Sequence, residues 1–148
     1  MEAVRFEDFV GIVNALHKEI ERIKTAEAAR LGLKGADVMC LYYLVKSPDG
    51  MTGSELARAC DVSRAAVSRT LSHLASEGIV EVDAGSEGSR YRALVRLTEH
   101  GRQVTAPLLG IIREVVGEAG HAFDGCDRER VYDVLNETLG RLRCLSRT

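Results

Sequence analysis

The amino-acid sequence predicts a mainly α-helical protein with a small β-hairpin. Apolar residues recur at helical spacing near both ends, short capped helices occupy the centre, and strand-like segments follow them. At 148 residues with 45% hydrophobic content, the chain suits one ordinary domain with a real core. We therefore expect a single domain over residues 1–148. A helical region at 1–30 and 100–148 would flank a compact lobe at 34–98.

The first segment predicts a long helix from Phe6 to about Ala29. Its apolar residues are spaced three and four apart, which places them on one narrow seam. They are Phe6, Phe9, Val13, Leu16, Ile20 and Ile23. Such a seam needs a partner helix, from the same chain or from a second subunit.

Two short helices are predicted next. The first covers residues 34–45 and is stopped by the turn cluster Ser47-Pro48-Asp49-Gly50. The second begins at Thr52, because Thr52 followed three residues later by Glu55 is a capping box. The sequence "DVS" then interrupts this helix, and Asp61 suits a turn because aspartate tolerates left-handed backbone geometry.

A fourth helix and a hairpin complete the predicted lobe. Ser63 is a good N-cap, and Gly78 followed by Ile79 is a plausible helix end. The strand-like segments "IVEVD" and "YRALVRLT" follow, separated by the polar turn "AGSEGS". Two short helices joined by a tight turn and followed by a hairpin form a winged helix-turn-helix.

Two further helices are predicted near the C-terminus. A capping signal at Thr98 begins a long helix that we expect to bend near Pro107. Asp127 is expected to cap the last helix, which has a leucine- and valine-rich side. The apolar residues of this last helix are Val131, Val134, Leu135, Leu139, Leu142 and Leu145.

The helix that starts after Ser63 is the main candidate for a functional surface. From Ser63 to Ser76 it contains two arginines and no acidic residue. A helical wheel buries Val67, Leu71 and Leu74, and turns small and polar residues outward. The outward residues are Ala65, Arg69, Ser72 and Ser76, with Ala66, Ser68 and His73 at the margins. This face is small enough for a DNA major groove; the alternative is a solvated helix without a partner.

The sequence resembles the MarR family of bacterial transcriptional regulators. The resemblance lies in "TGSELARACDVSRAAVSRTLSHLASEGIVEV" followed by "RLTEHGR", and the order of helices extends it over almost the whole chain. It implies that the terminal helices form a homodimer, that the second helix of the motif enters the major groove, and that the wing contacts the minor groove. In many members a small anionic or phenolic compound releases the DNA.

The resemblance can be carried over to individual residues. Arg69 falls on the arginine of the family's "V-S/T-R" motif, while Arg64, at the helix start, is expected to contact phosphate. The wing departs from the pattern, because Ser89-Arg90-Tyr91 stands where Asp-x-Arg is usual. Either Arg90 or Arg92 substitutes, or the wing binds more weakly. The DNA-binding candidates are Ser63, Arg64, Ala65, Ala66, Ser68, Arg69, Ser72, His73, Arg90 and Arg92.

Three residues are candidates for an effector site. Tyr42 and Tyr43 lie on a helix that borders the effector cavity in the resembled family, although adjacent tyrosines usually divide between core and surface. His17 lies beside the seam of the first helix, where packing is the alternative to ligand contact. We expect a small aromatic or anionic effector.

Other classes of function have less support. The net charge of −2 does not indicate that the chain binds a polyanion such as DNA. DNA binding therefore depends on where the basic residues lie on the surface. No catalytic motif, cofactor site or metal-ligand spacing stands out, so we expect neither an enzyme nor a cofactor or metal. With neither a membrane span nor a signal peptide apparent, a cytoplasmic protein is expected.

The sequence thus predicts a dimeric DNA-binding regulator, a repressor released by an effector, on double-stranded DNA with an inverted-repeat operator. One alternative is a winged-helix interaction module without DNA readout. Another is a thiol-based redox regulator. We expect the cysteines to be small buried apolar residues, but Cys40, Cys126 and Cys144 are candidates for oxidation.

Overall fold

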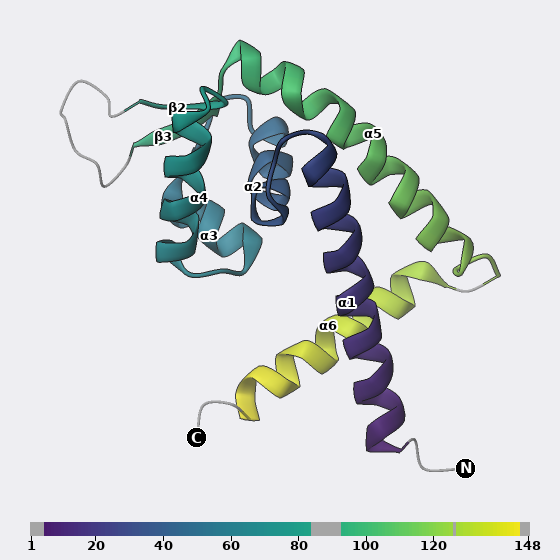
Figure 1. The fold of residues 1–148 in the computed structure, drawn as a ribbon. Coiled ribbons are helices and arrows are strands. Elements are labelled where there is room, and N and C mark those ends of the chain that lie inside the picture. Colours follow the sequence, from purple (N-terminus) through teal and green to yellow (C-terminus); the bar gives the residue numbers. More distant parts are fainter. Residues whose placement is uncertain (1–4, 84–92, 126, 146–148) are drawn as a thin grey trace. The chain divides into compact units, whose positions relative to one another are not determined.

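The computed structural model describes residues 5–83, 93–125 and 127–145, except for the side chain of Phe6. Figure 1 shows a mostly helical chain with a small sheet, as the sequence predicts. The chain forms two compact units, Met1–Ile111 and Ile112–Thr148. The boundary lies inside the fifth helix, so the first unit contains the whole winged helix-turn-helix.

The first unit begins with four helices, whose predicted positions are confirmed to within one or two residues. They are α1 (Phe6–Arg30), α2 (Gly35–Lys46), α3 (Gly53–Cys60) and α4 (Arg64–Ser76). A three-stranded sheet follows from β1 (Met51–Thr52), β2 (Val80–Asp83) and β3 (Leu94–Leu97). The helix α5 (Glu99–His121) follows β3 after one residue, Thr98.

The predicted caps of α3 and α4 are present. The Glu55 amide donates to Thr52 Oγ1 at 3.2 Å and the Thr52 amide donates to Glu55 Oε2 at 2.9 Å, so the capping box is complete. At α4, the Ala66 amide donates to Ser63 Oγ at 3.1 Å. Between the two helices Asp61 has a φ of 55°, the left-handed geometry expected of this turn. Local hydrogen bonds therefore fix where α4 starts.

The sheet contains one strand that the sequence does not predict. The order is β1-β3-β2, with both pairings antiparallel. The predicted pairing of the two strands is confirmed, because Val80 pairs with Leu97 and Val82 with Val95. The predicted turn between them lies outside the described residues. The sequence does not predict β1, because a strand of two residues is too short to show an alternation of apolar and polar side chains. Met51 of β1 pairs with Val95, a residue far away in the sequence.

The core of the first unit lies between α2, α3, α4 and the sheet. Its largest fully buried apolar side chains are Leu41, Leu44, Leu56, Val67 and Leu74. Val67 and Leu74 come from the predicted buried side of α4, whereas Leu71 is only half-buried. The burial of one side of α4 leaves its opposite side facing outward.

The junction between α4, the sheet and α5 is held by Thr98. Its Oγ1 donates to the Gly78 carbonyl oxygen at 2.6 Å and accepts from the Gly101 amide at 2.9 Å, which confirms the predicted cap. A Cβ on Gly101 would collide with the Ile79 carbonyl oxygen. The close approach of α5 to the strand that follows α4 therefore requires glycine at this position.

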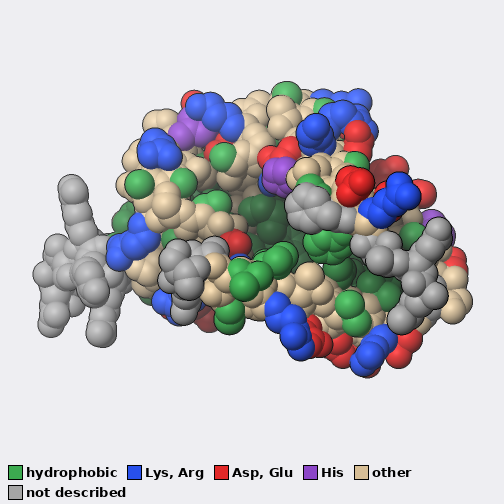
Figure 2. Space-filling view, turned by 90° about the horizontal axis from the view of Figure 1, so that it is seen from below, with side chains coloured by type: hydrophobic (Ala, Val, Ile, Leu, Met, Phe, Trp, Pro, Cys, Tyr) green, Lys and Arg blue, Asp and Glu red, His purple; other side chains and the backbone are tan. Residues whose placement is uncertain are grey.

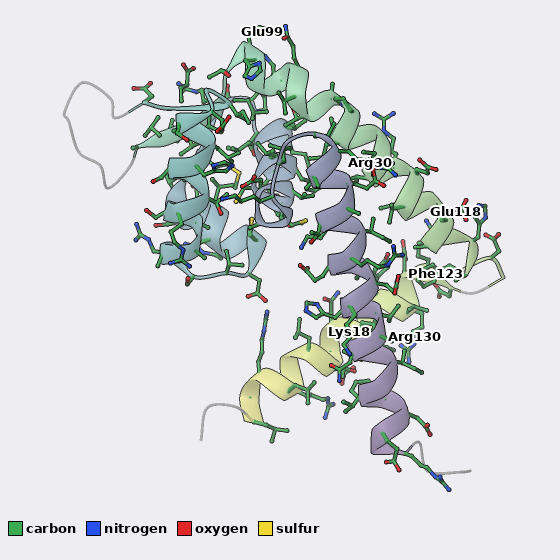
Figure 3. The ribbon with its side chains drawn as sticks, in the orientation of Figure 1. Lys18, Arg30, Glu99, Glu118, Phe123 and Arg130 are labelled. Atoms are coloured by element: carbon green, nitrogen blue, oxygen red, sulfur yellow. The ribbon has the colours of Figure 1, made fainter. Side chains whose placement is uncertain are left out.

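The second unit contains the end of α5 and the helix α6 (Arg128–Leu145). The Arg130 amide donates to Asp127 Oδ1 at 3.2 Å, which confirms the predicted cap of α6. Phe123, labelled in Figure 3, stacks on Tyr132 with ring centroids 5.9 Å apart. Helix α5 is continuous through Pro107, and a bend there stays a prediction.

Candidate nucleic-acid interface

Helix α4 presents a continuous polar surface. Within the first unit, most of the residues predicted to contact DNA are exposed on it. These are Ser63, Arg64, Ala65, Ser68, Arg69 and Ser72. We call this set the α4 face. Ala66 is half-buried and points toward the interior side of the helix start.

A hollow of about 550 Å³ borders the α4 face. Ser54, Arg64 and Ser68 are among its polar lining residues, while Leu71 and Val82 contribute apolar surface. The hollow is thus bounded by the start of α3, by α4 and by the sheet. The hollow therefore offers hydrogen-bonding groups beside apolar surface, next to the α4 face.

His73 lies differently from the rest of the predicted set. Its Nε2 is buried and lies 3.7 Å from Oδ2 of Asp37, a residue of α2 that is itself almost fully buried. The same Asp37 oxygen accepts a hydrogen bond from the Lys34 amide at 2.8 Å, at the start of α2. The sequence predicts His73 as a surface residue near DNA, but the structure turns Nε2 inward. A wheel cannot detect a partner on another helix.

The described base of the wing is braced by an arginine that the sequence analysis did not single out. Arg96 Nη1 lies 3.2 Å from Asp83 Oδ2 across the β2-β3 pair, and Arg96 Nε donates to the Asp49 carbonyl oxygen at 2.9 Å. Arg90 and Arg92, the predicted wing contacts, lie outside the described residues. Side chains alternate between the two faces of a strand, so the strand-like segment "YRALVRLT" already places Arg96 on the opposite face from Val95 and Leu97. This alternation is the sequence signal for Arg96.

Charges of both signs are spread over the face of the molecule that Figure 2 shows. Figure 2 shows Lys and Arg side chains interspersed with Asp and Glu, and no single broad basic field on the face in view. Five ion pairs on the helices join residues three or four apart in sequence. Arg64 and Arg69 take part in none of the ion pairs found among the described residues. Within the described part of the chain, no acidic side chain therefore competes for their guanidinium groups.

The predicted effector residues fall into two places. Tyr42 and Tyr43 are half-buried on α2, with ring centroids 5.4 Å apart in an edge-to-face arrangement. Lys46 Nζ lies 4.7 Å from the centre of the Tyr42 ring, and its hydrogen bond with Tyr42 raises the pKa of Lys46. His17 is exposed on α1. No hydrogen bond, ion pair or ring contact between described residues joins His17 to this tyrosine pair.

Two other kinds of site are absent from the described ranges. No cluster of three or more His, Cys, Asp or Glu side chains there could hold a metal ion. No helix in the described part of the chain is both long and apolar enough to cross a membrane.

Comparison with known families gives one match. The model of the MarR family matches residues 31–90, from the loop before α2 to the wing. The matched segment contains α2, α3, α4 and the α4 face. No curated protein sequence matches this chain.

Solved structures with the same fold are numerous at low sequence identity. A MarR family transcriptional regulator from Silicibacter pomeroyi is 22% identical, with a TM-score of 0.69 over 96% of this chain and 94% of the other. A MarR/EmrR family regulator from Acinetobacter sp. ADP1 is 18% identical, with a TM-score of 0.79 over 95% and 99%. The M. tuberculosis regulator MOSR, solved in complex with DNA, is 22% identical, with a TM-score of 0.70 over 94% and 98%.

Proposed function

We propose that this chain is a member of the MarR family, whose model matches residues 31–90, and that it is a dimeric, sequence-specific DNA-binding transcriptional regulator. We further propose that it is a repressor, which a small-molecule effector releases from an inverted-repeat operator. The observation that carries the proposal is the α4 face. It presents two arginines without ion-pair partners among the described residues, at a surface of small and hydroxyl-bearing side chains.

The α4 face suits both kinds of DNA contact. Alanine and serine keep the helix surface flat, so that the helix fits a major groove about 12 Å wide. Arg69, in the exposed middle of the helix, would donate two hydrogen bonds to a guanine edge. Arg64 is the first residue of α4, where the free amides and the helix dipole also favour a phosphate. We therefore assign base readout to Arg69 and backbone contact to Arg64.

Dimer formation is supported by apolar side chains left exposed on the terminal helices. On α1 these are Phe9, Ile12, Val13, Leu16 and Ile20, which include most of the predicted seam. On α6 they are Tyr132, Val134, Leu135, Leu139, Leu142 and Leu145. Apolar surface on this scale is typical of a subunit interface. A twofold dimer would read two half-sites about one helical turn, ~34 Å, apart.

The effector is proposed to bind at the aromatic pair of α2. The two tyrosine rings offer edge and face contacts to an aromatic ligand, and Lys46 supplies a positive charge beside them. A small aromatic or anionic compound fits this chemistry. Titration of such compounds into the original protein and into Tyr42→Ala tests the assignment. Weaker binding of the compound by Tyr42→Ala supports it, and equal affinity contradicts it.

The central experiment measures binding to the DNA upstream of the protein's own gene at low and high salt. We expect a sequence-preferring complex whose affinity falls with salt, with few phosphate contacts per subunit. Arg69→Ala should weaken specific binding by about 1 to 3 kcal/mol and relax preference at one position. Arg113→Ala, an exposed arginine on α5, is the matched control and should leave affinity unchanged.

A winged-helix interaction module without DNA readout is the competing proposal. It is favoured by the net charge of −2 and by the mixed charges of the surface. The same experiment separates the two proposals. No sequence preference at low salt, or equal affinity of Arg69→Ala and the original protein, would reject the regulator in favour of the module.

A further inference from the structure

Three sulfur-bearing side chains line one small pocket of the first unit. Met39 and Cys40 lie on α2, and Cys60 is the last residue of α3. The Sγ atoms of Cys40 and Cys60 are 3.9 Å apart. The sequence shows no C-x-x-C spacing, so only the packing of α2 on α3 brings the two thiols together.

The distance between the two thiols suits a shared metal ion. A metal–thiolate bond is about 2.3 Å long, so two such bonds that meet at about 120° place their sulfur atoms about 4.0 Å apart. The observed 3.9 Å is close to this separation, which is that of two ligands of a three-coordinate ion. The third position suits the thioether of Met39, because a methionine side chain has three rotatable bonds and adapts to irregular spaces.

The chemistry of these ligands selects the metal. Thiolate and thioether sulfur are soft ligands, which favour Cu(I) over harder ions such as Mg²⁺ and Ca²⁺. A structural zinc site takes four ligands, mostly cysteine and histidine. In the part of the chain that the structure describes, no group of three or more His, Cys, Asp or Glu side chains could hold a metal. The two thiols therefore have no partners there that would complete a zinc site.

We propose that Cys40, Cys60 and Met39 form a binding site for one Cu(I) ion in three-coordinate geometry. The proposal depends on these three side chains and not on the α4 face, so its test does not require the protein to bind DNA.

The pocket has the space, the access and the charge that the ion requires. Its volume of about 120 Å³ exceeds the ~30 Å³ that one water molecule occupies in the liquid, so a single ion fits. Cys40 is buried, but Cys60 is only half-buried and gives a route from solvent. Lys24 of α1 lines the same pocket, and its Nζ lies 2.7 Å from Glu21 Oε1. The positive charge of Lys24 would offset the negative charge of two thiolates around a monovalent ion.

Binding of the ion exchanges it for protons. Each cysteine binds as a thiolate, so one Cu(I) ion displaces two protons, and the thioether of Met39 releases none. The two thiolates and the ion together carry one negative charge. No electron is transferred, and both sulfur atoms keep their oxidation state. Burial and the neighbouring Cys60 raise the pKa of Cys40 to about 12, so the proton of Cys40 is one that the ion displaces at neutral pH.

The test titrates the full-length protein, without oxygen, into Cu(I) held by the coloured chelator bicinchoninate. The protein carries Cys126→Ser and Cys144→Ser, because Cys144 is exposed on α6 and Cys126 lies outside the described residues. We call it the two-cysteine protein. It should remove one equivalent of Cu(I) from the chelator, as the loss of the chelator's colour measures. Zinc chloride in equal amount should not displace the bound Cu(I).

Further substitutions in the two-cysteine protein test each ligand. Cys60→Ser and Cys40→Ser should each abolish the removal of Cu(I) from the chelator, with circular dichroism to show that the variants are folded. Met39→Leu keeps an apolar side chain of similar size but removes the sulfur. It should weaken Cu(I) binding by at least about tenfold, since even residues that only orient a metal ligand contribute 10- to 100-fold. Met51→Leu, outside the pocket, is the matched control and should leave the affinity unchanged.

The second readout is X-ray absorption at the copper edge of the loaded two-cysteine protein, which needs no substitution at the site. We expect three sulfur neighbours at about 2.3 Å and no nitrogen or oxygen neighbour. Failure to remove Cu(I) from the chelator, unchanged binding in the folded Cys60→Ser variant, displacement by zinc, or nitrogen and oxygen neighbours would each overturn the inference. The DNA-binding experiment uses no copper, so the proposed function can fail while the copper site is confirmed, and the reverse.

Discussion

The lobe around α4 and the helix α6 use similar apolar residues with opposite results. In the lobe, Leu56 and Leu74 are completely buried against neighbouring elements of the same unit. In α6, no residue is buried, although leucine and valine repeat along one side of the helix. The lobe therefore has the contacts to be stable as one unit, whereas α6 has apolar surface that still requires a partner.

The largest effect on stability is expected from shortening a buried side chain in the core of the lobe. Leu74 is 0% exposed, so Leu74→Ala should lower the free energy of unfolding by about 2 to 5 kcal/mol. Denaturant unfolding followed by circular dichroism measures the change. A loss below that of an ordinary surface substitution would show that the lobe core is not the stabilising unit.

The next largest effect is expected at the junction of α4, the sheet and α5. Gly101→Ala would place a Cβ against the Ile79 carbonyl oxygen, so the backbone at Gly101 or at Ile79 would have to shift. We expect a loss of about 1 to 3 kcal/mol in unfolding free energy, as for other overpacked sites. Gly110→Ala, on the same helix with open space around it, is the matched control and should be neutral or slightly stabilising.

A smaller effect is expected from removing a cap. Thr52→Ala removes the hydroxyl that accepts from the Glu55 amide, and should cost about 0.5 to 2 kcal/mol of stability. Thr52→Ser keeps the oxygen and should recover most of the loss. Equal unfolding midpoints for the alanine and serine variants would contradict a role for the hydroxyl.

The smallest effect on the stability of the monomer is expected in α6. Leu139 is 45% exposed, so Leu139→Ser should change the unfolding free energy of a dilute monomer by less than about 0.5 kcal/mol. It should instead raise the dimer dissociation constant, measured by analytical ultracentrifugation over a concentration series. A large loss of stability without a change in association would remove the distinction between the lobe and α6.

The features that could be predicted from sequence are those fixed by neighbouring residues. The caps at Thr52, Ser63 and Asp127 depend on bonds spanning three residues, so the sequence shows them directly. The left-handed turn at Asp61 is equally local. The same locality explains why the helix boundaries agree so closely with the structure.

The features that were missed arise from tertiary packing. The pairing of His73 with Asp37, the approach of Cys40 to Cys60, and the strand β1 each join positions far apart in sequence. A helical wheel gives the direction of a side chain but not the element it meets. The α4 face could therefore be predicted in outline, while the inward turn of His73 on the same helix could not.

β3 lies in the middle of the sheet, so both of its edges pair with a neighbouring strand. β2 holds one edge of β3, and the short β1, directly before α3, holds the other. Arg96 adds a bond from the same strand to the Asp49 carbonyl oxygen in the preceding loop. A displacement of β3 is thus expected to reach the first turn of α3, which couples the described base of the wing to the helix pair.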